Sequence, residues 1–399
     1  MNRKILDKIA YLAGDSDVIE AMTDLPSKEP FDQQIKEFLY EVSKALMKDP
    51  RSRQYSDVIT FAFWIRKASI EKLEKDSRLK DGRFRLGRGV AFHIAPSNVP
   101  VNFAYSLAVG LLTGNSNIVR VPSKEFLQIQ IIVDGWISAL EKHQQFKPYI
   151  ALIKYSHDPD INDELSSIAD TRIIWGGDDT IAKIRKSPLP PRSAEITFAD
   201  RYSLAVIDAK AYLTCEDKEK AASDFYNDTY FSDQNACTSP RIVVWIGDRK
   251  EEAKKEFWEQ LHELVLKKYV FRDIQGVNKL TNTYLAAAGY ESVKVVAHSD
   301  NLIVRLSVDR LDRRLLNFLG NSGFFYEYDC DDVMELREIF NDKRCQTVGI
   351  FGDKDWLKPL FQTGIKGVDR IAPIGHTMDF GLIWDGMDLV SLLTRIVCG

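Results

Sequence analysis

Short runs of β-branched and aromatic residues recur along this chain, and each run is followed by a proline or glycine turn and then by helical periodicity. The first run, 90–95, stops at the turn 96–100, and an apolar helix is predicted over 103–112. A second run at 117–121 leads to a predicted helix over 126–140. Because parallel strands need a crossover helix between them, this order predicts a parallel sheet covered by helices.

The same alternation continues towards the C-terminus. Further strands are predicted at 149–155, 172–175, 196–198, 203–207, 242–246, 323–328 and 346–351, with two more within 293–306. A long amphipathic helix is predicted over 250–268. The fold class expected from this order is α/β, with two domains and parallel-rich sheets. Residues 1–80 differ, because their periodicity predicts a mostly helical segment with helices at 31–46 and 56–73.

Composition excludes several classes of protein. The chain has 399 residues and a net charge of −4 without a long block of one sign, so nucleic acid and anionic membranes are not expected partners. A transmembrane helix needs about 18 or more consecutive apolar residues, and no such run occurs. The five cysteines are widely spaced without a CxxC pair, and residues 1–8 lack the apolar core of a signal peptide. We therefore expect a reducing, cytoplasmic setting and no metal site.

One cysteine has a distinctive position. Cys237 lies among small and polar residues directly before the apolar run 242–246, and Pro240 marks the entrance of that strand because proline cannot donate inside a central strand. The pattern places Cys237 on a turn at the mouth of a buried strand. Scaffolds often present nucleophiles from such turns, whereas most cysteines are inert small hydrophobes. The local pattern leaves both interpretations open.

A pair of glycines also separates a strand from a helix. Gly176 and Gly177 lie between the predicted strand 172–175 and a predicted helix at 181–186. Glycines at this kind of junction let backbone N–H groups approach a phosphate. The GxGxxG fingerprint is absent, and an ordinary tight loop explains the pair equally well.

Several pieces, taken together and in this order, resemble a known family. They are the segments 89–100, 110–120, 174–178, 233–241, 346–348 and 384–386. This series resembles the aldehyde dehydrogenase superfamily, and more closely the LuxC-type fatty acyl reductases of bacterial luminescence systems, which reduce acyl thioesters to aldehydes. The resemblance covers roughly residues 85 to 395 and implies two α/β domains with an interdomain active-site cleft.

The resemblance implies a domain plan. Residues 1–80 would form the helical N-terminal segment. Residues 81–232 would form a nicotinamide dinucleotide-binding domain, completed by about 370–399, and residues 233–369 would form the catalytic domain that carries Cys237.

The resemblance also implies catalytic roles. Cys237 would be the nucleophile, and the Asn98 side-chain amide would donate to the oxyanion together with the Cys237 backbone N–H. Removing one such donor typically lowers the rate by about 10²–10³. The cysteine needs a lowered pKa, and the sequence offers only His93 and His376 as candidate activators, although an ordinary core or surface histidine is the favoured interpretation of both.

The cofactor-binding residues follow in the same way. Arg120 would face the adenosine ribose, and Ser123 and Lys124 would lie beside it, an arrangement that favours NADPH over NADH. Gly176 and Gly177 would lie along the diphosphate. A sixth candidate, Glu338, resembles the superfamily's nicotinamide-ribose glutamate, although the Gly-Pro that normally follows is missing.

One departure from the superfamily bears on the reaction. Aldehyde-oxidising members carry a Glu-Leu-Gly-Gly segment whose glutamate activates the hydrolytic water, whereas the corresponding stretch 196–203 contains no glutamate. Glu195 lies directly ahead of it and could still supply one. Without this base, an acyl-enzyme should react with hydride rather than water.

The expected activity is therefore the NADPH-dependent reduction of an acyl-CoA or acyl-protein thioester to the aldehyde. Aldehyde oxidation to the acid, and a non-catalytic acyl-carrying subunit of a synthetase complex, are the alternatives. The expected partners are the acyl thioester, an acyl-activating synthetase and further copies of the chain.

Overall fold

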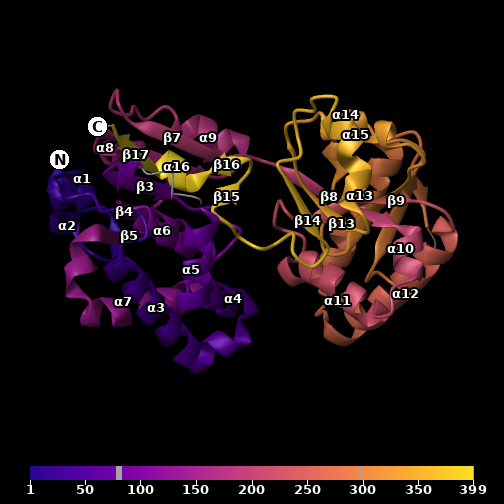
Figure 1. The fold of residues 1–399 in the computed structure, drawn as a ribbon, viewed down its shortest axis with the longest axis horizontal. Coiled ribbons are helices and arrows are strands. Elements are labelled where there is room, and N and C mark those ends of the chain that lie inside the picture. The colour runs from indigo at the N-terminus through magenta and orange to yellow at the C-terminus, as the bar shows by residue number, and fades with distance from the viewer. Residues whose placement is uncertain (78–82, 297–298, 399) are drawn as a thin grey trace. The chain divides into compact units, whose positions relative to one another are not determined.

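The computed structural model describes residues 1–77, 83–296 and 299–398 of the chain (Figure 1). The expectations that fall on residues 78–82, 297–298 and 399 lie outside the described residues. Contacts divide the chain into two compact units, one made of Met1–Ala199 with Gly381–Gly399, and the other of Asp200–Phe380. Both units are built around a parallel-rich sheet with helices, which confirms the predicted α/β class.

The first unit contains a six-stranded sheet in the order β1-β5-β4-β3-β6-β7. Its strands are β1 (Ala10–Ala13), β3 (Val90–Ile94), β4 (Ser116–Arg120), β5 (Ile150–Lys154), β6 (Thr171–Trp175) and β7 (Ala194–Phe198). All neighbours pair in parallel except β1, which is antiparallel to β5. The chain builds outward from β3 to β5 on one side and then from β6 to β7 on the other. In sheets of this kind, ligands bind at the carboxyl ends of the strands, where the order reverses.

The rest of the first unit is mostly helical. The helices are α1 (Arg3–Leu6), α2 (Ser16–Ala21), α3 (Gln33–Lys48), α4 (Ser56–Trp64), α5 (Lys67–Asp76), α6 (Asn102–Leu112), α7 (Leu127–Lys142), α8 (Pro159–Ser167), α9 (Asp178–Ile184) and α16 (Leu389–Leu393). Short 3-10 turns are η1 (Met22–Asp24), η2 (Pro50–Gln54) and η3 (Gln144–Tyr149). Two strand pairs complete the unit, β2 (Phe84–Gly87) with β17 (Thr394–Val397) and β15 (Ile383–Trp384) with β16 (Met387–Asp388).

The N-terminal segment is mostly helical, as predicted, with two differences. The single helix expected over 56–73 is divided between α4 and α5, because Arg66 adopts an extended conformation with ψ 156°. Strand β1 was not predicted, and it adds an edge to the sheet. Helix α3 packs on α7 at Gly135, where a Cβ atom would lie 2.7 Å from a methyl carbon of Leu46.

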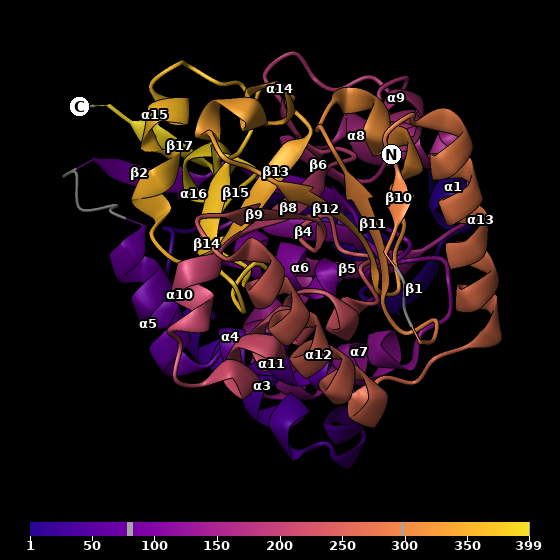
Figure 2. The ribbon, with the colours of Figure 1, turned by 90° about the vertical axis from the view of Figure 1, so that its right-hand side faces the viewer.

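The second unit contains a seven-stranded sheet in the order β10-β11-β12-β9-β8-β13-β14 (Figure 2). Its strands are β8 (Tyr202–Asp208), β9 (Pro240–Ile246), β10 (Lys294–Val295), β11 (Val304–Val308), β12 (Phe324–Asp329), β13 (Cys345–Phe351) and β14 (Arg370–Pro373). Its helices are α10 (Ala209–Leu213), α11 (Lys218–Asp228), α12 (Lys250–Lys268), α13 (Asp273–Gly289), α14 (Arg337–Phe340) and α15 (Lys358–Phe361), with 3-10 turns η4 (Tyr230–Ser232), η5 (Arg313–Phe318), η6 (Val333–Leu336) and η7 (Lys354–Leu357).

Strand β9 shows why this sheet is buried on both faces. Val243 and Trp245 point into one apolar cluster, which includes residues of α11 and α12. Ile242, Val244 and Ile246 point into the cluster on the other face. Successive side chains of a strand alternate between faces, so an uninterrupted apolar run requires a core on each side.

Residues 200–232, which were expected to belong to the dinucleotide-binding domain, group by their contacts with the second unit. The physical reason is that β8 pairs along most of its length with β9. Within the described residues, no helix combines the length and apolar character needed to cross a bilayer.

Candidate active site

The loop that carries Cys237 begins with an unusual backbone. Asp233 and Gln234 both have positive φ angles, 54° and 52°, which reverse the chain after η4. A turn at Cys237 and Thr238 then leads into β9, which begins at Pro240 as predicted. Cys237 is half-buried, and its carbonyl oxygen accepts a hydrogen bond of 2.8 Å from the Ser203 hydroxyl on β8. The loop is therefore fixed against the amino end of the sheet.

Gln234 holds the loop from within. Its side chain is fully buried, and its Oε1 accepts hydrogen bonds from the backbone N–H groups of Gly323, at 2.7 Å, and Phe324, at 3.1 Å. Its Nε2 donates to the carbonyl oxygen of Pro240 at 3.0 Å. Gly323 has a φ of 83°, and a Cβ atom there would lie 2.3 Å from the Tyr230 hydroxyl. One amide thus joins the cysteine loop to β9 and to the start of β12.

Asp233 connects the same loop to the region of α13. Its carboxylate accepts hydrogen bonds from the Tyr269 hydroxyl and from Gln275 Nε2, the latter at 3.1 Å and 3.2 Å to the two oxygens. These contacts direct the Asp233 carboxylate towards α13.

A second segment packs against the residues that follow Cys237. The hydroxyl groups of Thr238 and Ser239 lie 3.2 Å and 3.6 Å from the sulfur of Met378. Met378 belongs to the segment 374–379, which is held by two charged side chains, Asp228 and Arg370.

Asp228 and Arg370 bind the backbone of this segment in complementary ways. The Asp228 carboxylate accepts from the N–H groups of Gly375, at 2.6 Å, and Thr377, at 3.0 Å. Arg370 donates to the carbonyl oxygens of the segment, including that of His376 at 2.9 Å. Burial raises the pKa of Asp228 to about 6, although these hydrogen bonds favour its ionised form.

The two candidate histidines lie in different surroundings. His93 is buried in the first unit, where its ring nitrogens bond to the Ser106 hydroxyl at 2.7 Å and to Asn117 Oδ1 at 3.0 Å. Burial lowers its pKa to about 4, so the ring is neutral and structural. The exposed His376 pairs through Nδ1 with Asp379 at 2.8 Å.

The first unit gathers most of the other candidate residues at one edge of its sheet. Arg120 ends β4, Asn98 follows β3, and Gly176 follows β6. These three strands are neighbours and run in parallel, so their carboxyl ends meet at the same edge. This edge includes the position where the strand order reverses, between β3 and β6.

Arg120 is held in place by Tyr155. Its guanidinium carbon lies 4.4 Å from the centre of the Tyr155 ring, and its NH2 group donates to the Tyr155 carbonyl oxygen at 3.3 Å. A hollow of ≈ 450 Å³ opens nearby, lined by the start of α8 and the end of α9 and including Asn162, which bonds to the Tyr155 hydroxyl. Ser123 and Lys124 are exposed in the turn after β4.

The glycine pair forms a tight strand-to-helix connection. The N–H of Gly176 donates to the carbonyl oxygen of Phe198 at 3.1 Å, and Gly177 is the N-cap of α9. Asp178 and Asp179 occupy the first turn of this short helix. Their negative charge disfavours a diphosphate on the axis of this helix.

Glu338 lies in the second unit and is exposed on α14. Its Oε1 accepts a hydrogen bond of 3.3 Å from the backbone N–H of Arg313. The candidate residues are therefore divided, with Cys237 and Glu338 in the second unit and Asn98, Arg120, Ser123, Lys124, Gly176 and Gly177 in the first.

Glu195 is occupied by two guanidinium groups. Its carboxylate lies 2.5 Å from Arg172, which is almost fully buried, and 2.7 Å from Arg185. Burial raises the pKa of Glu195, but the hydrogen bonds and charges of Arg185 and Arg172 outweigh burial and lower it overall. A carboxylate held in this way is a weak base.

We expect Glu195→Gln to weaken the fold without changing turnover. The variant leaves the buried Arg172 without its ionic partner, and we expect the free energy of unfolding at pH 7 to fall by about 2 kcal/mol. Because the folded-state pKa is lowered, this stabilisation is present above the ordinary glutamate pKa and is lost as the pH falls through the folded value. Urea unfolding of both proteins between pH 7 and pH 3.5 measures the difference.

The matched control for this experiment is Glu141→Gln, on the exposed end of α7. Its unfolding free energy should follow the wild-type value within about 0.5 kcal/mol at every pH. A loss of turnover in folded Glu195→Gln would contradict the structural role of Glu195.

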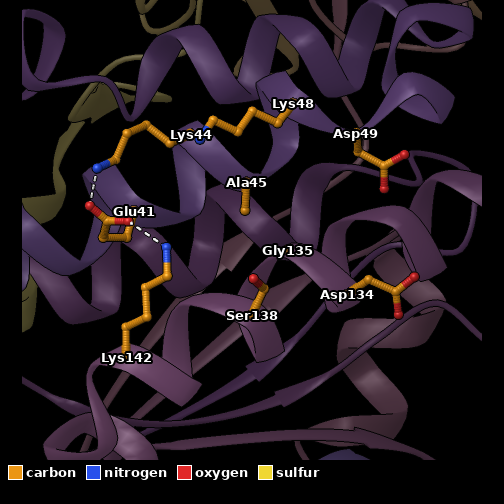
Figure 3. Close-up of a pocket in the computed structure, with 9 residues that line it drawn as sticks. All are labelled: Glu41, Lys44, Ala45, Lys48, Asp49, Asp134, Gly135, Ser138 and Lys142. Carbon is orange, nitrogen blue, oxygen red and sulfur yellow. Dashed lines mark hydrogen bonds and ion pairs between the residues drawn. The ribbon is translucent and has the colours of Figure 1, made fainter.

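A further hollow, of ≈ 380 Å³, lies between α3 and α7 (Figure 3). Lys44 and Lys142 both point at the carboxylate of Glu41, and each forms an ion pair with it. Asp49 and Asp134 are both paired with Arg51. Since the protein itself balances these charges, we assign no ligand to this hollow.

Comparison with known proteins identifies the family. The family model described as acyl-CoA reductase (LuxC) matches residues 17–396. The chain belongs to this family. The match includes the cysteine loop, the glycine pair and most of the N-terminal helical segment.

The curated relatives of this LuxC family member include the long-chain acyl-protein thioester reductase of Aliivibrio fischeri. It is 28% identical over 320 residues, which are 78% of this chain and 64% of the relative. The chain thus spans less than two thirds of the length of that relative.

Solved structures support the fold of the LuxC family member. An NAD-dependent benzaldehyde dehydrogenase from Corynebacterium glutamicum matches with a TM-score of 0.65 and 14% identity, covering 97% of this chain and 90% of that one. A Thermus 1-pyrroline-5-carboxylate dehydrogenase with bound NAD matches with a TM-score of 0.63 and 13% identity, covering 96% and 83%. At these identities the comparison establishes the aldehyde dehydrogenase-like fold, as predicted.

Proposed function

We propose that this protein reduces an acyl thioester, acyl-CoA or acyl-protein, to the aldehyde with a nicotinamide cofactor. The observation that carries the proposal is the fixed loop that presents the half-buried Cys237 at the amino end of β9. Membership of the acyl-CoA reductase family and the names of the curated relatives support the substrate class.

Cys237 performs the covalent steps. Its thiolate attacks the carbonyl carbon of the thioester, and the CoA or carrier thiolate leaves, so that one thioester is exchanged for another. Asn98 supplies a side-chain donor to the carbonyl oxygen as negative charge develops on it, together with the Cys237 backbone N–H. When bound, the nicotinamide cofactor supplies the hydride that reduces the acyl carbon. Cys237 finally leaves as a thiolate when the thiohemiacetal breaks down to the aldehyde.

The residues of the first unit fit a nicotinamide dinucleotide. Arg120 offers a fixed cation at the carboxyl edge of the sheet, and Gly176 and Gly177 form the tight connection between β6 and α9 at the same edge. Ser123 and Lys124 are exposed beside the end of β4, where a 2′-phosphate would find a second cation. This favours NADPH, with NADH as the alternative. Glu338 is the candidate for the nicotinamide ribose.

The proposal favours reduction over hydrolysis because the segment that carries the hydrolytic glutamate in aldehyde-oxidising relatives offers no glutamate free to act as a base. The stretch 196–203 contains no glutamate, and Glu195 is held by two arginines. An acyl-enzyme without an activated water persists until hydride arrives. A docked acyl-activating synthetase and self-assembly are further parts of this proposal, based on the family.

A matrix of acyl-CoA chain lengths against NADPH and NADH tests the proposed function. We expect loss of reduced cofactor matched mole for mole by aldehyde, with NADPH preferred. The aldehyde-oxidising alternative requires steady acid formation from aldehyde and NAD⁺ without CoA. The acyl-carrying alternative requires stable acylation of Cys237 with no oxidation of either cofactor.

A further inference from the structure

Arg241 is the second residue of β9, four positions after Cys237. Its guanidinium folds back over the loop, because one of its terminal nitrogens donates to the carbonyl oxygen of Gln234 at 2.7 Å. This contact closes the segment from Gln234 to Arg241 into a compact turn. Cys237 lies in the middle of that turn, so a fixed cation is part of the same small structure as the thiol.

The guanidinium is not satisfied by hydrogen bonds alone. Arg241 Nε is buried and has no hydrogen-bond partner among the described residues. Burying a cation is unfavourable unless an anion compensates it. Burial lowers the pKa of the Arg241 guanidinium, whereas the negative charge of the Cys237 thiolate raises it. The thiolate is thus the negative charge that this cation can stabilise.

The other charged groups around the loop have partners of their own. From the α13 side, Asp233 accepts hydrogen bonds from Tyr269 and Gln275. The buried Lys279, whose pKa is lowered to about 8 by burial, donates to the carbonyl oxygens of residues 301 and 302.

From the segment 374–379, His376 pairs with Asp379. Asp228 accepts from backbone N–H groups of this segment, and Arg370 donates to its carbonyl oxygens. Arg241 is the cation that shares the closed turn with Cys237.

We propose that Arg241 is a positioning residue that stabilises the thiolate form of Cys237. This activation needs no histidine. It is therefore compatible with the structural role of His93 in the first unit. A cation close to a thiol favours the ionised form and lowers the pH at which the thiol becomes a nucleophile. The importance of this effect for catalysis rests on the proposed function, whereas the ionisation of the thiol does not.

Alkylation by iodoacetamide as a function of pH tests this proposal without any acyl substrate. The full-length protein is labelled briefly at each pH, and the rates at Cys237 and Cys398 are measured on separate peptides by mass spectrometry. Cys398 is exposed and serves as an internal reference in the same protein. We expect the Cys237 midpoint to lie clearly below that of Cys398 in the wild-type protein.

Two substitutions separate charge from shape. In Arg241→Met we expect the Cys237 midpoint to rise by about one pH unit or more, so that labelling at pH 7 slows about tenfold, while the rate at high pH is unchanged. In Arg241→Lys, which keeps the charge, most of the wild-type midpoint should be retained. Arg249→Gln removes an exposed arginine of the same unit and should leave both midpoints unchanged.

An unchanged Cys237 midpoint in folded Arg241→Met overturns the proposal. If that variant does not fold, a wild-type Cys237 midpoint equal to that of Cys398 overturns it equally. A protein that shows the lowered, Arg241-dependent midpoint but reduces no acyl thioester would refute the proposed function and leave this inference standing.

Discussion

Replacing Cys237 with alanine is expected to abolish the acyl-CoA-dependent oxidation of NADPH. The proposed route passes through a covalent acyl-enzyme on this sulfur, and alanine removes the nucleophile. The rate should fall by more than about 10⁴-fold, to the background of the assay. Because the side chain is half-buried and small, the free energy of unfolding should change by less than about 1 kcal/mol. Initial rates from absorbance and a urea titration measure both quantities.

The other accessible cysteines provide the controls. Cys215 is half-buried and Cys398 is exposed, and alanine at either position should leave the rate close to that of the wild-type protein. Persistent turnover in Cys237→Ala, or an equal loss in Cys215→Ala, would contradict the assignment of the nucleophile.

Gln234→Leu is expected to give the largest loss of stability. Leucine fills a similar volume but cannot bond to the backbone N–H groups of Gly323 and Phe324 or to the carbonyl oxygen of Pro240. Each buried polar group left unsatisfied costs about 1–3 kcal/mol, so the free energy of unfolding should fall by about 3 kcal/mol. The loop would also lose its fixed position against β9. We therefore expect the reductase activity to fall together with the stability. Urea unfolding followed by circular dichroism measures the first effect.

The neighbouring residue Asn235 offers a matched control. Its side chain is exposed and bonds only to that of Asn321 in the contacts described, at 3.1 Å. We expect Asn235→Ala to change the unfolding free energy by no more than about 0.5 kcal/mol. Equal stabilities for Gln234→Leu and Asn235→Ala would show that the buried amide does not hold the loop.

The central strands of both sheets could be predicted from the sequence because they are buried on both faces. The run 242–246 is apolar throughout, and the structure places its residues alternately in two cores. Elements with weaker patterns were not predicted. Strand β1 is a short edge strand of four residues, and α13 keeps Ile274, Val277 and Tyr284 exposed rather than packed in a core.

The site was only partly predictable, because some of its features follow from local sequence signals and others depend on contacts between distant residues. The position of Cys237 before β9 follows from local signals, namely Pro240 and the apolar run. The contacts that fix its loop join residues far apart in the chain, such as Gln234 with Gly323 and Asp228 with Gly375. No spacing rule in one sequence reveals such pairs. Arg241 and Gln234 were visible in the motif, but their roles depend on how the turn closes.

Trapping the acyl-enzyme is the most direct test of the central claim, which is that Cys237 accepts the acyl group and passes it to hydride. The protein is mixed with a long-chain acyl-CoA in the absence of cofactor and analysed by peptide mass spectrometry. We predict one acyl group on Cys237, stable over minutes, that disappears as aldehyde when NADPH is added. Acylation at another residue, or release of the group as the free acid at the same rate with and without NADPH, would contradict the account.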